Sequence, residues 1–146
     1  MLTYVAEGRG VYDELCAMTV RTETGLSGRI VQDVVTRPAR KWARIQGSEG
    51  GIEWVNGYTA QADAVSLLRP GAPPDVHALP KTRPDDFIEE LRHIEAHLGE
   101  TAERSPLRLE RGLETMLLVA AAHRSEERRR RIVIDYGKGF RPDAVQ

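Results

Sequence analysis

The residues best suited to chemistry gather in one stretch, "RPARKWARIQGSEGGIEW", residues 37–54. Its cationic and aromatic side chains are of the types that bind phosphate, stack on nucleic-acid bases or hold a sugar. A phosphate-binding loop needs glycines that lead from a strand into a helix, whereas these glycines join two β-rich runs. The stretch therefore predicts a hairpin turn with a positive φ at Gly50 or Gly51.

Nucleic acid is not the expected partner of this stretch. The whole chain has 21 Lys and Arg against 22 Asp and Glu, so it has no general attraction for polyanions. We take Arg37, Arg40 and Trp42 as candidate substrate-binding residues, because guanidinium groups suit sugar hydroxyls or a carboxylate and the indole ring suits a sugar face. The alternative is that the three are surface residues that cap a strand.

Histidine and cysteine offer little for a metal site. Glu89, His93 and His97 recur at helical spacing and could share one helix face, but the His-Glu-x-x-His zinc pattern is missing, so a solvated face is expected. Cys16 is the only cysteine, which excludes disulfides and four-thiolate sites and favours a reducing, cytoplasmic compartment. We expect no metal site and no catalytic residue in this chain.

The elements that must position these residues begin with strands. Two β-rich runs, 15–22 and 29–36, flank "ETGLSG" and predict a first hairpin. Alternating residues in 41–46 and 52–55 predict a second hairpin, and 64–68 reads as a further short strand. The five prolines of residues 69–84 predict a crossover loop without regular structure.

Helical periodicity replaces the strand pattern in the second half of the chain. Phe87, Leu91 and Ile94 recur at helical spacing, and a second helix is predicted to begin after Ser105. A closing strand is expected over 131–135 and a loose tail over 139–146. Strands followed by helices predict an α+β fold, a largely antiparallel open-faced sheet with two main helices packed on one face, in a single domain over 1–138.

The order of these pieces carries a family resemblance. "ETGLSGRIVQDVVTRPARKWARIQGSEGGIEW", a proline-rich gap, "FIEELRHIEAHL" and "PLRLERGLETMLLVAAAHRSEERRRRIVIDY" together resemble the C-terminal half of the Gfo/Idh/MocA family of NAD(P)-dependent oxidoreductases. Members pair an N-terminal Rossmann domain with a sheet-and-helix domain and move hydride between the nicotinamide and a sugar or cyclitol carbon. NAD or NADP is therefore implied for a complete member.

The resemblance implies only part of such an enzyme. The sequence has no strand followed by G-x-G-x-x-G, no Glu-Lys-Pro segment and no Asp-x-x-x-His helix before the first hairpin. We expect a substrate-side and oligomerisation domain that binds no cofactor itself and is inactive without a missing Rossmann domain. The alternative is a free-standing scaffold or small-ligand-binding module that kept the sheet but lost redox chemistry.

Self-association is the partner expectation that follows. Family members commonly form dimers or tetramers through the outer sheet face, and apolar residues fall on both faces of the predicted strands. We expect a homo-oligomer with Trp42, Arg44 or Trp54 near the contact. No run approaches 18 apolar residues, so no membrane partner is expected.

Overall fold

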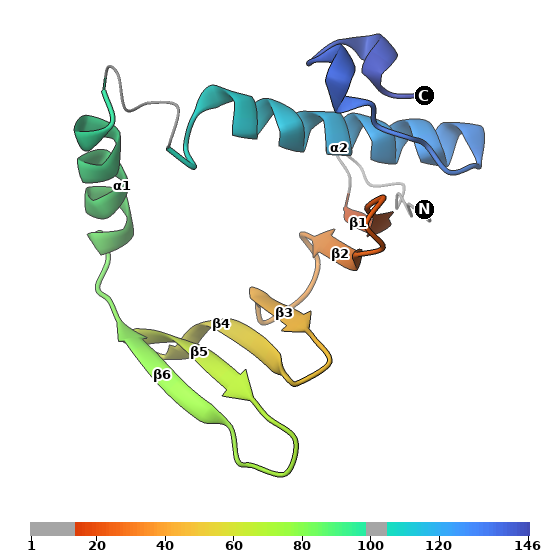
Figure 1. The fold of residues 1–146 in the computed structure, drawn as a ribbon. Coiled ribbons are helices and arrows are strands. Elements are labelled where there is room, and N and C mark those ends of the chain that lie inside the picture. The colour runs from red at the N-terminus through yellow and green to blue at the C-terminus, as the bar shows by residue number, and fades with distance from the viewer. Residues whose placement is uncertain (1–13, 99–104) are drawn as a thin grey trace. The chain divides into compact units, whose positions relative to one another are not determined.

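The computed structural model describes residues 14–98 and 105–146, drawn in colour in Figure 1. Contacts along the chain divide it into two compact units. Unit 1 comprises Met1–Thr36 with Ala102–Gln146, and unit 2 comprises Arg37–Thr101. Within residues 14–98 and 105–146, each unit contains one antiparallel sheet and one α-helix. The predicted α+β class, with an open antiparallel sheet and two main helices, is confirmed.

Unit 1 begins with the predicted first hairpin. Strand β1 (Leu15–Arg21) pairs with β2 (Ser27–Asp33) along their full lengths. Gly25 takes a positive φ of 91° in the turn, where a side chain would be strained. The carboxylate of Asp33 ends β2, because it accepts hydrogen bonds from the amides of Val35 and Thr36 at 3.0 and 2.6 Å.

Helix α2 (Leu109–Arg128) carries the small core of unit 1. Its Leu117 and Ala121 are buried against Ala144 and Val145, from the last residues of the chain. The hydroxyl of Ser125 donates to the carbonyl oxygen of Arg130 at 2.7 Å, which satisfies a backbone acceptor just after the helix ends.

The C-terminal segment differs from both predictions made for it. Residues 131–135 form no strand of a sheet; they make one isolated antiparallel bridge, Ile134 with Val145. The short 3-10 helices η2 (Tyr136–Lys138) and η3 (Pro142–Ala144) turn the chain back onto itself. The tail expected to be loose is therefore ordered, because Ala144 and Val145 supply apolar surface that α2 buries.

Unit 2 is a four-stranded antiparallel meander, shown in Figure 1. Its strands are β3 (Trp42–Gln46), β4 (Gly51–Thr59), β5 (Ala62–Leu68) and β6 (Asp75–Pro80), and helix α1 (Asp85–Ala96) follows. Gly50 has the predicted positive φ, 153°, in the β3–β4 turn.

Strand β6 corrects the prediction that residues 69–84 lack regular structure. Three of the five prolines fall before β6, and Pro80 is its last residue. As an edge strand, β6 pairs only with β5. Edge positions and strand ends tolerate proline because its missing amide need not donate to a neighbouring strand. The prolines of residues 69–84 therefore argued against a strand, but an edge strand such as β6 accommodates them.

The strand register assigns side chains to the two sheet faces. Residues paired across antiparallel strands share a face, and neighbours along a strand alternate. One face holds an apolar group that we call the apolar sheet face, made up of Ile45, Ile52, Trp54, Val65, Leu67 and Leu79, and Asp63, Asp75 and His77 lie on the same side at its margin. The opposite face mixes Trp42 and Val76 with Arg44, Glu53 and Ser66.

Candidate functional site

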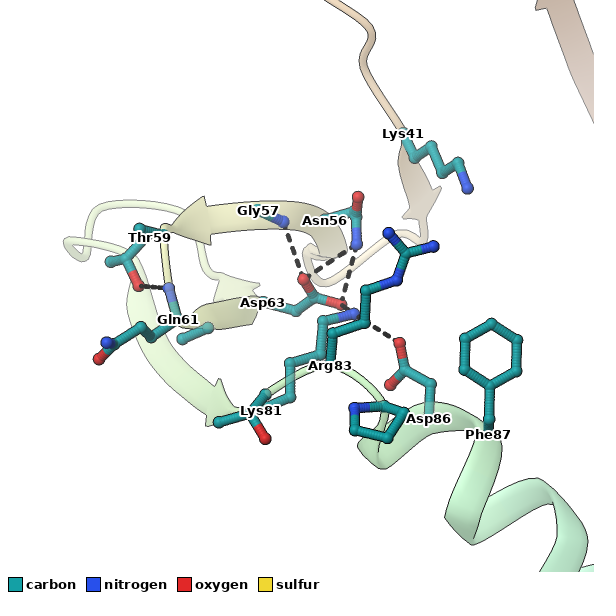
Figure 2. A pocket seen from close by; sticks show the side chains of 14 residues that line it. Lys41, Asn56, Gly57, Thr59, Gln61, Asp63, Lys81, Arg83, Asp86 and Phe87 are labelled. Atoms are coloured by element: carbon teal, nitrogen blue, oxygen red, sulfur yellow. Dashed lines mark hydrogen bonds and ion pairs between the residues drawn. The ribbon is translucent and has the colours of Figure 1, made fainter.

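A pocket of about 430 Å³ lies at one end of the sheet in unit 2 (Figure 2). Six short pieces of the chain line it: Lys41 before β3, the last residues of β4, the β4–β5 turn, the start of β5, residues 81–84, and the first turn of α1. All of them belong to one unit. The site can therefore be described from unit 2 alone.

Asp63 on β5 is the centre of the hydrogen bonding in this pocket. It is 6% exposed, and its carboxylate accepts a hydrogen bond from the Gly57 amide at 2.8 Å and from Asn56 Nδ2 at 3.1 and 3.3 Å. An irregularity in the β4–β5 pairing between Val55 and Thr59 accompanies a φ of +66° at Gly57. This bulge brings both donors to one carboxylate.

Lys81, just after β6, completes the partners of Asp63. Its Nζ lies 2.9 Å from Asp63 Oδ2 and 3.0 Å from Asp86 Oδ2 in α1. The hydrogen bond from the Gly57 amide, as the largest cause, and that from Lys81, as the second, lower the pKa of Asp63 below its ordinary value. Asp63, followed by Asp86, raises the pKa of Lys81. Lys81 is thus held as a cation at neutral pH and lacks the free amine that a nucleophile or general base requires.

A second carboxylate positions the start of α1. Asp85 accepts from the Thr82 amide at 2.6 Å and from the Thr82 hydroxyl at 2.9 Å. The hydrogen bond from the Thr82 amide is the larger cause, and the one from the Thr82 hydroxyl the second, of a lowered pKa at Asp85. The reciprocal bond runs from the Asp85 amide to the Thr82 carbonyl oxygen at 2.8 Å. These contacts hold residues 81–84 in a fixed turn beside the pocket.

Two further cations line the pocket without a counter-ion. Among the residues that the structure describes, the side chains of Lys41 and Arg83 make no ion pair and no hydrogen bond. Figure 2 shows the Arg83 side chain extending toward the side of the pocket where Lys41 lies. Lys41 and Arg83 can bind an anion. The two carboxylates of the pocket, Asp63 and Asp86, already pair with Lys81.

The residues predicted to bind substrate lie elsewhere. Arg37 and Arg40 are exposed in the connection that precedes β3, and Trp42 is exposed on β3 itself. None of the three lines the pocket, although Lys41 stands between the second and the third. Their role in substrate binding stays a prediction.

The register divides the predicted interface residues between the two faces. Trp54 lies on the apolar sheet face, whereas Trp42 and Arg44 lie on the opposite one. Arg44 Nη2 donates to Gln46 Oε1 at 3.0 Å along its own strand. A single sheet-face contact can therefore involve Trp54 or the other two, but not all three.

Sequence reasoning missed Asp63, Lys81 and Asp86. One signal was present, because Asp63 is the only charged residue in the apolar strand "ADAVSLL". Lys and Asp are almost never fully buried unless paired, so an acid in such a strand calls for a partner. Its partner could not be identified, because Lys81 lies in the proline-rich segment that was predicted to be a loop.

His93 in α1 and His97 at its C-cap belong to no group of potential metal ligands among the described residues. In the described ranges 14–98 and 105–146, no three His, Cys, Asp or Glu side chains are grouped so that they could bind one ion. The rings of His93 and His97 stack with centroids 4.0 Å apart, and Glu89 pairs with Arg92 at 2.5 Å. These contacts join residues one helical turn apart along α1 and its C-cap.

Comparisons of this chain with protein-family models, curated proteins and solved structures find no match. Across the part of the chain that the structure describes, neither helix combines the length and the apolar character needed to cross a bilayer. Functional inference therefore rests on the residues and their geometry.

Proposed function

We propose that this chain is the substrate-side and oligomerisation domain of a Gfo/Idh/MocA-like oxidoreductase that uses NAD or NADP on a sugar or cyclitol. In this proposal the chain is incomplete for hydride transfer by itself and works with a Rossmann domain. The observation that carries the proposal is the apolar sheet face of unit 2, which suits assembly better than solvent exposure.

The apolar sheet face runs across β3, β4 and β5, whereas on β6 the same face holds Leu79 together with His77 and Asp75, which pair with Val65 and Leu67. Ile45 pairs with Ile52, and Ile52 pairs in turn with Leu67. The next row joins Trp54 to Val65. Ile45, Ile52 and Leu79 are 68%, 46% and 48% exposed. Contiguous apolar surface of this kind marks an interaction site more often than a solvated face.

A second copy of the chain is the occupant that we propose for this face. The acidic and histidine residues of this face, Asp63, Asp75 and His77, lie at one end of β5 and on the edge strand β6. The apolar centre can therefore meet an identical centre without placing like charges together. Two-fold packing of sheet faces also agrees with the assembly that the family resemblance implies. The element order supports the same resemblance, with two hairpin pairings and the two helices in the expected sequence.

The pocket chemistry agrees with a non-catalytic role for this chain alone. Hydride transfer requires a bound dinucleotide and a group that moves a proton. Asp63 and Lys81 are engaged in an ion pair, which favours both charged forms and leaves neither group to exchange a proton near neutral pH.

The second candidate function is a free-standing small-ligand-binding module. The observation that favours it is the pair of cations, Lys41 and Arg83, that line the pocket without a counter-ion among the described residues. This candidate needs no partner domain and no redox cofactor. It is compatible with self-association, so the oligomeric state alone does not decide between the two.

Sedimentation equilibrium tests the assembly proposal. We expect a homodimer or a higher even oligomer at micromolar concentration. The variant Ile45→Gln is expected to weaken association by about tenfold or more, since burying one such side chain is worth about 1.5–3 kcal/mol. Arg44→Gln, on the same strand but the opposite face, is the matched control and is expected to leave the mass unchanged. A monomeric mass at every concentration would refute the proposed interface.

A further inference from the structure

We infer that the pocket of unit 2 is a binding site for a small polyol that carries one anionic group, a carboxylate or a phosphate, held by Lys41 and Arg83. This inference does not depend on the proposed assembly role. It rests on the cavity, charges and hydrogen-bonding groups of unit 2. None of the six residues that define the apolar sheet face lines this pocket.

The charge balance of the pocket favours an anion. Its charged lining consists of three cations, Lys41, Lys81 and Arg83, and two carboxylates, Asp63 and Asp86. Both carboxylates are within 3.0 Å of the same lysine, Lys81. Three cations against two carboxylates give this lining a net charge of +1, and neither Lys41 nor Arg83 forms an ion pair with a described residue, so both are available to a bound anion.

The two cations project from backbones that are held in place. The Lys41 carbonyl oxygen accepts a hydrogen bond from the Asn56 amide at 3.0 Å, which extends the β3–β4 pairing to this residue. Arg83 follows Thr82, which Asp85 holds through two hydrogen bonds. In Figure 2 the Arg83 guanidinium extends across the pocket toward the Lys41 side. A planar guanidinium suits the paired oxygens of a carboxylate or phosphate, and an ammonium adds a point charge.

The remaining lining suits the hydroxylated part of such a ligand. Thr59 and Gln61 supply a hydroxyl and an amide at the turn between β4 and β5, and Phe87 adds an exposed aromatic ring from α1. The cavity volume of about 430 Å³ falls within the usual range for small-molecule sites. Hydroxyl groups could bond to the polar side chains while a C–H face lies against the ring.

Calorimetric titration with four probes at low ionic strength tests the inference on the full chain. The probes are D-gluconate, D-glucose 6-phosphate, D-glucose and inorganic phosphate. We expect one of the two anionic sugars to bind with a Kd of about 1 mM or tighter, because the site is open to water. Binding of D-gluconate would identify the anionic group as a carboxylate, and binding of D-glucose 6-phosphate would identify it as a phosphate. D-Glucose, which lacks the anionic group, is expected to bind at least about tenfold more weakly.

Substitutions locate the binding and guard against a folding artefact. Lys41→Gln and Arg83→Gln are each expected to weaken binding about tenfold or more, since each removes a charged partner of the anion. Arg69→Gln, an exposed arginine of unit 2 outside this pocket, is the matched control. Unchanged urea unfolding midpoints, followed by tryptophan fluorescence, would show that the variants fold.

Three results would overturn the inference. The first is no saturable binding of either anionic sugar. The second is inorganic phosphate binding as tightly as D-glucose 6-phosphate, which would remove the polyol part of the assignment. The third is unchanged affinity in both folded pocket variants, which would place the anion elsewhere on the chain.

Discussion

Alanine at position 50 should destabilise unit 2 by direct contact between two strands. A Cβ atom built on Gly50 would lie 2.2 Å from the carbonyl oxygen of Leu68, the last residue of β5. That atom belongs to the backbone, so the clash can be relieved only if the β3–β4 turn moves away from β5. The φ of +153° adds a backbone strain of its own.

Gly71 provides the comparison that isolates this clash. It also has a positive φ, 72°, but no heavy atom lies within 4 Å of a Cβ placed there. We expect Gly71→Ala to cost about 1 kcal/mol, since left-handed strain exceeds the gain from a stiffer unfolded chain. Gly50→Ala should cost about 2–4 kcal/mol, because the forced backbone shift adds to a similar strain.

Tryptophan fluorescence in urea is the appropriate assay. The chain has two tryptophans, Trp42 and Trp54, and both belong to unit 2. The signal therefore follows unfolding of this unit alone. If the two alanine variants lose the same free energy of unfolding within about 0.5 kcal/mol, the close approach of the β3–β4 turn to β5 is wrong.

Three further predictions concern charge, cofactor binding and unit 1. The folded-state pKa of Asp63 lies below its ordinary value of 3.8, so the ionised carboxylate stabilises unit 2 above that pH, and this stabilisation is lost as the pH falls through the folded-state pKa. Asp63→Asn should therefore make the free energy of unfolding of unit 2, followed by tryptophan fluorescence, less dependent on acid pH. An unchanged acid transition in this variant would contradict the prediction. Calorimetry should detect no binding of NAD or NADP, since the sequence lacks the phosphate-binding turn, and a stoichiometric micromolar site would overturn the incomplete-enzyme proposal. Ser125→Ala should cost unit 1 about 1 kcal/mol in circular dichroism unfolding, because Ser125 is 1% exposed and donates to the Arg130 carbonyl oxygen; a loss near zero would mean that this bond adds nothing.

Local pattern was enough to predict most elements of the fold. The first hairpin follows from two β-rich runs around a glycine turn, and the second from strict alternation across 41–46. Helix α1 follows from apolar residues at helical spacing after Asp85 and Asp86. In each case neighbours along the chain carry the information, because turn chemistry and periodicity are local properties.

The features that escaped prediction depend on contacts between distant residues. Strand β6 exists because β5 supplies its hydrogen-bonding partner, and composition alone argued against it. The pairing of Asp63 with Lys81 requires the β5–β6 register, which sequence did not reveal. The order of the last residues depends on the apolar surface of α2, where Ala144 and Val145 are buried. Small side chains gave no periodic signal at these positions.

Isotope-filtered NOE spectroscopy on a mixture of labelled and unlabelled chains tests the proposed assembly most directly. It detects only contacts between copies, at concentrations where association is complete. Our account predicts intermolecular NOEs at the methyl groups of Ile45, Ile52 and Leu79, and none at Val76 on the opposite face of the same sheet. Intermolecular NOEs confined to the Val76 face, or no such NOEs at all, would contradict the claim that the apolar sheet face joins two copies of this chain.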